Sequence, residues 1–260
     1  MTAPMIDVRG LVLRGDGESA LVDDVSFTVD AGESVGIVGE SGSGKSLTLR
    51  RILGLLPDGV RATDGEVRVS GRVAMVFQDP LTALDPLARV GAQVAEVSRY
   101  AHRAGRERAR KHARELFVQV GLDASPRLFE ARPFELSGGQ RQRVVIAMAL
   151  ASDPQILLCD EPTTALDVTV QRQVLELLDR LRRERGLAML FVSHDLAVVS
   201  QVCARLIVMR RGRVEESGDT AVVLGSPQAD YTRMLLDAIP DLPPLAALPA
   251  APPSDAGGTA

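Results

Sequence analysis

The feature that most constrains this chain is a short apolar run that leads directly into a glycine-rich loop. Ser34–Val38 is predicted to be a buried strand, residues 39–46 (GESGSGKS) match the pattern G-x-x-x-x-G-K-[ST], and a helix is expected over 46–56. This order brings backbone N–H groups and a helix N-terminus together around one phosphate group. We therefore expect a nucleotide site, with Lys45 at the terminal phosphates and Ser46 on Mg²⁺. The expected binding residues are Gly39, Ser41, Gly42, Ser43, Gly44, Lys45 and Ser46.

Two acidic residues end a second apolar run. Asp160 and Glu161 follow residues 156–159, and a carboxylate at the carboxyl end of a buried parallel strand faces the ligand crevice. Asp160 is predicted to hold Mg²⁺, directly or through water, and Glu161 to polarise the attacking water. Such a pair can also simply cap the next helix, but the phosphate loop upstream favours the catalytic interpretation.

Residues 136–140 (LSGGQ) carry two signals at once. Ser137 followed by Gln140 is a capping box for a helix expected over 141–151. A cap does not require the adjacent Gly138 and Gly139, whereas two glycines allow the backbone to approach an anion closely. Both interpretations stay open from the residues alone.

The pattern along the chain indicates an α/β protein. Strands are expected at 5–13, 21–29, 34–38, within 66–77, at 156–159 and at 187–193, with a helix over 169–185 between the last two. A hairpin is expected at 205–209 and 213–216. Residues 82–151 have helical periodicity instead, and His102 and His112 within them are expected to be simple surface residues.

Composition excludes several classes of protein. The net charge of −4 argues against a nucleic-acid partner, and no apolar run approaches the roughly 20 residues that span a bilayer. The N-terminus lacks the pattern of a signal peptide, so a cytoplasmic location is expected. Cys159 and Cys203 lie among apolar residues and are expected to be buried core residues rather than a disulfide or metal site.

Taken together, these motifs resemble those of ABC transporter ATPases. In that family the LSGGQ signature of one subunit closes over the γ-phosphate held by the phosphate loop of another. The resemblance implies that two ATP molecules lie between two such subunits, with Ser137, Gly138, Gly139 and Gln140 contacting nucleotide. It adds Gln78 as a Mg²⁺ ligand in the Q-loop, Asp167 in the D-loop, and His194 as the catalytic switch histidine near the γ-phosphate.

The resemblance narrows to the peptide/nickel importer ATPases. Residues 77–86 (FQDPLTALDP) and 231–240 (YTRMLLDAIP) resemble segments of that group, and the similarity covers roughly 5–240. The chain departs from it in lacking an aromatic residue near Gly15 to stack on adenine, a charged segment between Gly71 and Val73, and a cysteine cluster near the end. Because the charged segment is missing, the antiparallel subdomain is expected to be trimmed. Because the cysteine cluster is missing, an iron–sulfur cluster near the end of the chain is excluded.

The resemblance implies an α/β P-loop NTPase of the ABC ATPase fold: a RecA-like core with an antiparallel β subdomain and a helical subdomain. The expected divisions are 1–78 (β subdomain and first part of the core), 79–152 (helical subdomain with the signature), 153–225 (second part of the core), 226–240 (family-specific C-terminal helix) and 241–260 (disordered tail).

The function implied is that of the ATP-hydrolysing subunit of an importer, most simply for oligopeptides or dipeptides, with ATP and Mg²⁺ as ligands. Expected partners are a second ATPase subunit (identical or a paralogue), two transmembrane permeases and, indirectly, a solute-binding protein, at the cytoplasmic face of the cell membrane. A nickel or other solute importer is the first alternative. A soluble ABC ATPase acting on nucleic acid and an exporter half are the others, although the chain lacks tandem cassettes, zinc cysteines and fused membrane helices.

Overall fold

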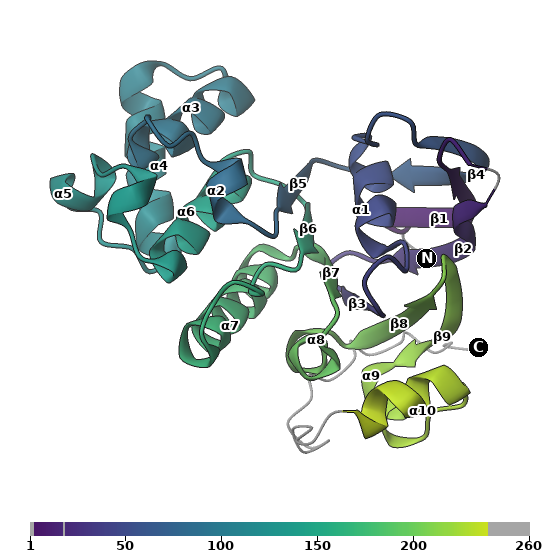
Figure 1. Ribbon diagram of the computed structural model, residues 1–260. Coiled ribbons are helices and arrows are strands. Elements are labelled where there is room, and N and C mark those ends of the chain that lie inside the picture. Colours follow the sequence, from purple (N-terminus) through teal and green to yellow (C-terminus); the bar gives the residue numbers. More distant parts are fainter. Residues whose placement is uncertain (1–2, 18, 239–260) are drawn as a thin grey trace, which may run out of the picture.

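Two β-sheets organise the computed structural model, which describes residues 3–17 and 19–238 (Figure 1). The antiparallel sheet has the strand order β2-β1-β4. The other has the order β5-β6-β7-β3-β8-β9, with parallel pairing from β5 to β8 and an antiparallel edge strand β9. The strands are β1 (Ile6–Arg14), β2 (Ala20–Val29), β3 (Ser34–Val38), β4 (Arg61–Val69), β5 (Val73–Val76), β6 (Ile156–Asp160), β7 (Ala188–Ser193), β8 (Arg205–Arg210) and β9 (Arg213–Asp219).

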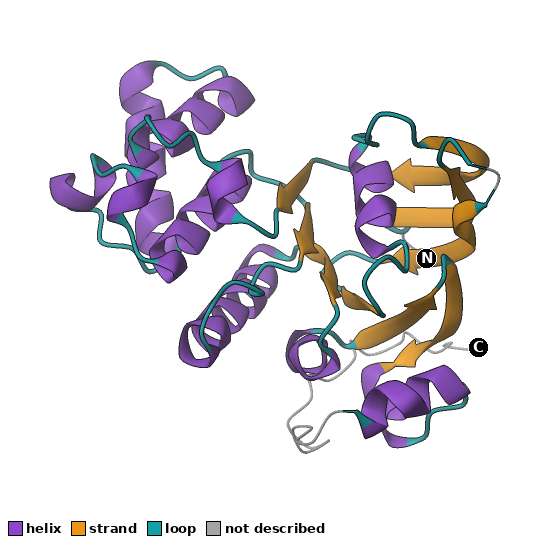
Figure 2. Ribbon diagram, viewed as in Figure 1, coloured by secondary structure: helices purple, strands orange, loops and turns teal. Residues whose placement is uncertain are grey.

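Helices cover the six-stranded sheet and form a separate arm (Figure 2). The helices are α1 (Lys45–Leu53), α2 (Pro80–Ala83), α3 (Val90–His102), α4 (Arg106–Gln119), α5 (Pro126–Phe129), a 3-10 turn (Pro133–Glu135), α6 (Gly138–Leu150), α7 (Val168–Arg185), α8 (Leu196–Val202), α9 (Thr220–Gly225) and α10 (Asp230–Asp237). Residues 80–150, from α2 to α6, make up the helical arm, which lies at the left of Figure 1. No helix in the described part of the chain is long and apolar enough to cross a membrane.

The hydrophobic core has two parts. One lies between the two sheets and includes Leu49 and Ile52 of α1, which packs against strands of both sheets. The other joins the opposite face of the six-stranded sheet, under α7 and α8, to the interior of the arm. Strands β3, β6 and β7 are buried along their whole length, as expected for parallel strands covered on both faces. Cys159 and Cys203 are free and fully buried in the second part, as expected.

Several element boundaries differ from those expected. Helix α1 ends at Leu53, three residues before the expected Leu56, because Gly54 (φ 78°) closes it. Helix α6 begins at Gly138 rather than at 141. Strand β4 begins at Arg61 because it pairs with the whole of β1, although its exposed polar residues give it little periodicity. Helix α9 was not expected, and the tail predicted at 241–260 lies outside the described residues.

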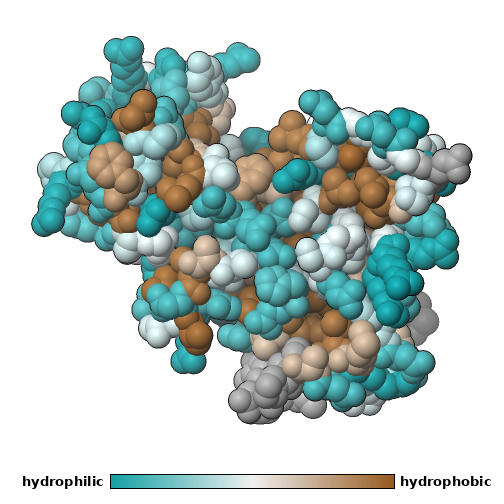
Figure 3. Space-filling view, in the orientation of Figure 1, coloured by the Kyte–Doolittle hydropathy of each residue, from teal (hydrophilic) through white to brown (hydrophobic). Residues whose placement is uncertain are grey.

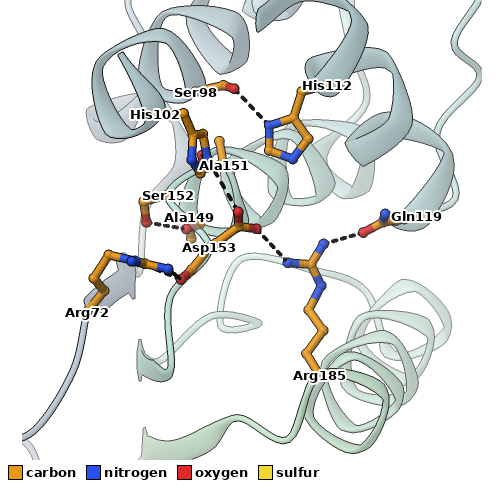
Figure 4. A network of polar contacts seen from close by, with 10 residues as sticks. All are labelled: Arg72, Ser98, His102, His112, Gln119, Ala149, Ala151, Ser152, Asp153 and Arg185. Atoms are coloured by element: carbon orange, nitrogen blue, oxygen red, sulfur yellow. Dashed lines mark hydrogen bonds and ion pairs between the residues drawn. The ribbon is translucent and has the colours of Figure 1, made fainter. Parts of the chain in front are cut away.

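The base of the helical arm is joined to the core around Asp153 (Figure 4). The Asp153 carbonyl accepts hydrogen bonds from Arg72 Nε and Nη2 (3.0 and 2.8 Å). Its carboxylate lies 3.4 Å from His102 Nε2 and 3.5 Å from Arg185 Nη1. These partners come from the start of β5 and the ends of α3 and α7, so the cluster ties the arm to two parts of the core.

His112 is not the simple surface residue that was expected. Its Nδ1 lies 2.7 Å from the hydroxyl of the buried Ser98, and its ring meets the His102 ring edge-on at 5.4 Å between centroids. Burial lowers the pKa of the His112 imidazole, so the neutral ring is favoured here. His112 is therefore half-buried on α4 and packs beside the Asp153 cluster.

Candidate functional site

The carboxyl ends of four parallel strands converge on one cavity. Strand order places β5, β6, β7 and β3 next to one another, and each is followed by a segment that the sequence singled out. The cavity has a volume of about 550 Å³. It is lined by Ser41, Gly42, Gly44, Lys45, Ser46, Leu47, Gln78, Glu161, Thr164 and His194. The crevice at this edge is where open α/β sheets bind ligands.

The phosphate loop follows β3 and depends on glycine at two crowded positions. Gly39 has φ 151°, and a Cβ there would lie 2.0 Å from the Met209 carbonyl oxygen of β8. Gly44 has φ 99°, and its Cβ would lie 2.9 Å from Val22 Cγ2. Both positions combine a left-handed backbone with a close neighbour, so any other residue would displace the loop. Helix α1 begins directly after Gly44, with its first N–H groups at the cavity.

Lys45 lies within this loop rather than pointing into solvent. Its ammonium donates to the carbonyl oxygens of Gly39 (2.7 Å) and Glu40 (2.8 Å), with the Ser43 hydroxyl at 3.4 Å. The residue is only 5% exposed. Burial lowers its pKa, while the negative charges of Glu161 and Asp160 act in the opposite direction. A buried cation whose charged form is disfavoured gains from an anionic ligand.

Asp160 and Ser46 are in direct contact beside the same cavity, which Ser46 lines. The Ser46 hydroxyl donates to Asp160 Oδ1 at 2.7 Å, so helix α1 is joined to the end of β6. Burial raises the pKa of the Asp160 carboxyl, and the hydrogen bond from Ser46 partly opposes this shift. A hydroxyl and a buried carboxylate form an oxygen donor set of the kind that Mg²⁺ prefers. They therefore fit the metal expected from the sequence.

The Glu161 carboxylate contacts three side chains, one from its own turn and two from segments that follow other strands. Its Oε2 accepts from Gln78 Nε2 (3.4 Å) and the Thr164 hydroxyl (3.0 Å), and lies 2.9 Å from His194 Nδ1. Glu161 has a left-handed backbone (φ 47°), and its N–H donates to the Val192 carbonyl at 2.9 Å. Non-glycine residues in this region are strained, and such strain gathers at functional sites.

Gln78 and Thr164 both contact Glu161. Gln78 was predicted as a metal ligand, and this stays a prediction: its amide contacts Glu161, while Ser46 and Asp160 contact each other. Thr164 was not predicted at all, although it lies three residues after Glu161 in the sequence EPTT. The only available signal was this short spacing, which lets a turn bring its hydroxyl back to the carboxylate.

The signature segment lies away from the described residues that line the cavity. Ser137 caps α6: Gln140 N–H donates to its hydroxyl (3.2 Å), and its own N–H donates to Gln140 Oε1 (2.9 Å). Asp167 likewise caps α7, by accepting from Thr169 and Val170 N–H groups (3.1 and 3.0 Å). The capping box predicted from the sequence is therefore present.

The two signature glycines have different surroundings. A Cβ on Gly139 would lie 2.5 Å from Val170 Cγ1, so this glycine allows α6 to pack against the start of α7. A Cβ on Gly138 would meet only Leu166 Cδ2, at an ordinary 3.5 Å. Packing within the chain therefore explains why a glycine is needed at Gly139, but it does not explain the glycine at Gly138.

Comparisons with known proteins agree with this arrangement. A family profile described as "ABC transporter" matches residues 22–164. The chain is 44% identical to the "Probable D,D-dipeptide transport ATP-binding protein DdpD" of Escherichia coli K12, over 93% of this chain and 80% of that one. It is 42% identical to the "Oligopeptide transport ATP-binding protein OppD" of Mycobacterium bovis, over 98% of this chain and 46% of that one, so it spans about half of this relative.

A solved structure shares the fold. The ATP-binding cassette MJ0796, described as a dimer in a post-hydrolysis state bound to ADP and Pi, superposes with a TM-score of 0.72 at 32% identity. The match covers 83% of this chain and 99% of that one. The predicted fold class, with its nucleotide-binding core, antiparallel sheet and helical subdomain, is confirmed. The chain belongs to the ABC transporter family, as an ATP-binding cassette that hydrolyses ATP.

Proposed function

We propose that the cavity beside the phosphate loop is the hydrolytic site and that Glu161 polarises the attacking water there. The observation that carries this assignment is the contact of one carboxylate oxygen with Gln78, Thr164 and His194. These contacts fix the carboxylate at the end of β6, on the same cavity as Lys45. His194, at the end of β7, is placed to sense the terminal phosphate, and Lys45 to hold it.

Mg²⁺ would be held by Ser46 and Asp160, with Gln78 joining them after a shift of its side chain. Among residues 3–17 and 19–238 no cluster of three His, Cys, Asp or Glu could hold a metal alone. This agrees with Mg²⁺, which usually takes one or two protein oxygens together with water and substrate phosphates. When bound, the ion would neutralise charge that develops on the phosphates.

A second cassette completes the site in this proposal. Ser137, Gly138 and Gln140 lie at the start of α6, outside the cavity that the same chain's phosphate loop lines. A signature segment from a partner would bring its backbone N–H groups and the helix N-terminus to the open side of the phosphates. Gly138, which has no internal reason to be glycine, would allow that close approach. The dimeric cassette MJ0796 provides a precedent for such pairing.

The transported solute is proposed to be a short peptide. The two relatives described above are named for dipeptide and oligopeptide transport, and the resemblance extends through the Q-loop and the C-terminal segment. The cassette would work at the cytoplasmic face of the cell membrane, with two permeases and, through them, a solute-binding protein. A nickel importer is the alternative, because the sequence resemblance covers both kinds of solute.

The permease contact is assigned to the segment after Gln78. Leu81 and Leu87 are 52% and 79% exposed, and both lie where the chain enters the helical arm. Figure 3 shows hydrophobic surface over the part of the molecule that the arm forms. Apolar surface that gathers into a patch often marks an interface with another protein. Because Gln78 contacts Glu161, a change at the nucleotide can reach this segment directly.

The test uses the cassette assembled with its permeases in vesicles. Leu81→Ser and Leu87→Ser should leave ATP binding by the isolated cassette unchanged but abolish stimulation of ATPase activity by peptide-loaded binding protein. Leu55→Ser is the matched control, because Leu55 is 61% exposed but follows α1. Normal transport by the Leu81 and Leu87 variants would contradict the docking surface. Stimulation by a nickel-loaded but not a peptide-loaded binding protein would overturn the peptide assignment.

A further inference from the structure

The C-terminal helix reaches the phosphate loop through one buried tyrosine. Tyr231 on α10 is 3% exposed, and its hydroxyl oxygen accepts a hydrogen bond from the backbone N–H of Glu40 at 3.1 Å. The two residues are 191 positions apart in the sequence. The roles assigned above to the phosphate loop do not explain this contact.

The tyrosine is held in place by the last two strands of the sheet. Glu216 on β9 accepts from the N–H groups of Gln228 and Ala229 (2.9 and 3.1 Å), which fixes the start of α10. At the end of β8, the Arg210 guanidinium lies 4.6 Å from the centroid of the Tyr231 ring. A cation at this distance from an aromatic ring is attractive. The hydroxyl thus belongs to a rigid support rather than to a loose tail.

Glu40 connects this support to the phosphate-binding lysine. While its N–H donates to Tyr231, its carbonyl oxygen accepts from Lys45 Nζ (2.8 Å) and from Ser43 N–H (3.2 Å). Because Glu40 is exposed, these backbone hydrogen bonds are the main contacts that hold it in place. Neighbouring Gly39 is confined by the Met209 carbonyl of β8. The first half of the phosphate loop is therefore braced by β8 and α10 together.

We propose that Tyr231 is a positioning residue for nucleotide binding: its hydroxyl fixes the Glu40 backbone, and through that backbone it fixes the Lys45 ammonium. This proposal rests on the nucleotide-binding role of the phosphate loop. Without the hydroxyl, the Glu40 N–H loses the one acceptor it has among the residues that the structure describes, and the loop must be ordered when the phosphates bind. Part of the binding free energy then goes into ordering the loop, so the affinity for nucleotide falls.

Tyr231→Phe tests this, because it removes one oxygen and keeps the ring under Arg210. Equilibrium competition against a fluorescent ATP analogue, on the full-length cassette, gives affinities for ATP and for magnesium pyrophosphate. We expect both to weaken about fivefold to tenfold, by the same factor, because the effect lies at the phosphates and not at the base. In the assembled transporter, kcat at saturating ATP should change less than twofold while KM rises.

The control is the chain's other tyrosine. Tyr100 is 73% exposed on the helical arm and also has an arginine over its ring, with Arg99 at 5.0 Å. Tyr100→Phe should leave both affinities unchanged. Tyr231→Phe affinities within twofold of wild type would overturn the proposal, and so would a loss for ATP that pyrophosphate does not share. Failure of the wild-type protein to bind or hydrolyse ATP in the same assays would contradict the proposed hydrolytic site, whatever the Tyr231 variant does.

Discussion

Glu161 shows how strain and hydrogen bonding act on one residue. The left-handed backbone at φ 47° is tolerated because the N–H remains bonded to Val192 at the edge of β7. The carboxylate is then fixed by Thr164 and His194 at distances of 3.0 and 2.9 Å. A base that must orient one water molecule benefits from such fixed geometry, because misplacement of a catalytic group is costly.

Glu161→Gln should keep ATP binding and lose turnover. Glutamine preserves the size of the side chain and one acceptor oxygen, but it is not a base, so single-turnover hydrolysis should slow by about 10² to 10⁴. Rapid-quench measurement of a single turnover gives this rate. Glu184→Gln is the control, because Glu184 lies on the exposed face of α7 and pairs with Arg180. Hydrolysis by Glu161→Gln within a few-fold of wild type would remove Glu161 from its assigned role.

The two signature glycines, Gly138 and Gly139, should differ in how much each contributes to the free energy of unfolding. Gly139→Ala places a Cβ 2.5 Å from Val170 Cγ1, and overpacking of this kind costs about 1–3 kcal/mol of unfolding free energy. Val170→Ala removes the obstructing methyl groups, so the double variant should be less destabilised than the sum of the two single variants. Urea unfolding measures all three.

Gly138→Ala is the matched comparison at the neighbouring position. Its Cβ meets only Leu166 at 3.5 Å, and alanine is a better helix former than glycine, so its unfolding free energy should not fall. Equal destabilisation by the two glycine substitutions, or strict additivity of Gly139→Ala and Val170→Ala, would show that the α6–α7 contact does not explain Gly139.

Sequence patterns predicted the strands that end at the cavity, but not the contacts between distant elements. Apolar runs such as β3 and β6 followed by glycine or carboxylate are local signals, and both strands lie where expected. Thr164 was missed although Glu161 lies only three residues before it, because no sequence pattern showed that the turn between them brings the hydroxyl back to the carboxylate. Tyr231 was missed because its contact depends on how segments far apart in the sequence meet. Strand β4 was underestimated for the same reason: its exposed residues follow the pairing with β1 and not a hydrophobic period.

Helix packing at the base of the arm predicts a dependence of stability on pH. Burial lowers the pKa of His112, so the unfolded chain binds its proton more readily than the folded chain. The free energy of unfolding should therefore rise with pH. This contribution is complete above the unfolded pKa of about 6.5 and is lost as pH falls below it. Asp153 and Glu115 oppose the shift, whereas His102 and Arg185 add to it.

The variant His112→Asn tests this dependence, because the asparagine oxygen can still accept from Ser98 but does not titrate. Urea unfolding between about pH 5 and pH 7 should show a shallower slope for His112→Asn than for wild type. Lys111→Gln is the control, because Lys111 is the neighbouring residue and lines one surface groove together with His112 but carries no imidazole. Identical slopes for His112→Asn and wild type would contradict the assignment.

At the scale of the whole molecule, the two half-sites proposed for one chain do not meet within it. The phosphate loop and Glu161 line one cavity, with Asp160 bonded to Ser46 beside it, while residues 137–140 at the start of α6 do not line that cavity. The sequence resemblance implied this separation, and the fold explains it, because α6 begins in the arm and the phosphate loop follows β3. Binding and hydrolysis should therefore respond differently to substitutions in the two half-sites.

The central claim is that Lys45 acts within its own subunit and Ser137 acts on the nucleotide of a partner. Nucleotide titration of the isolated cassette, paired with ATPase assays of the assembled transporter, tests it most directly with Lys45→Ala and Ser137→Arg. Lys45→Ala should lose ATP affinity in the isolated cassette. Ser137→Arg should bind ATP as wild type does and fail to hydrolyse it after assembly. If Ser137→Arg weakens ATP binding by the isolated cassette as much as Lys45→Ala does, the two half-sites belong to one chain and the account is wrong.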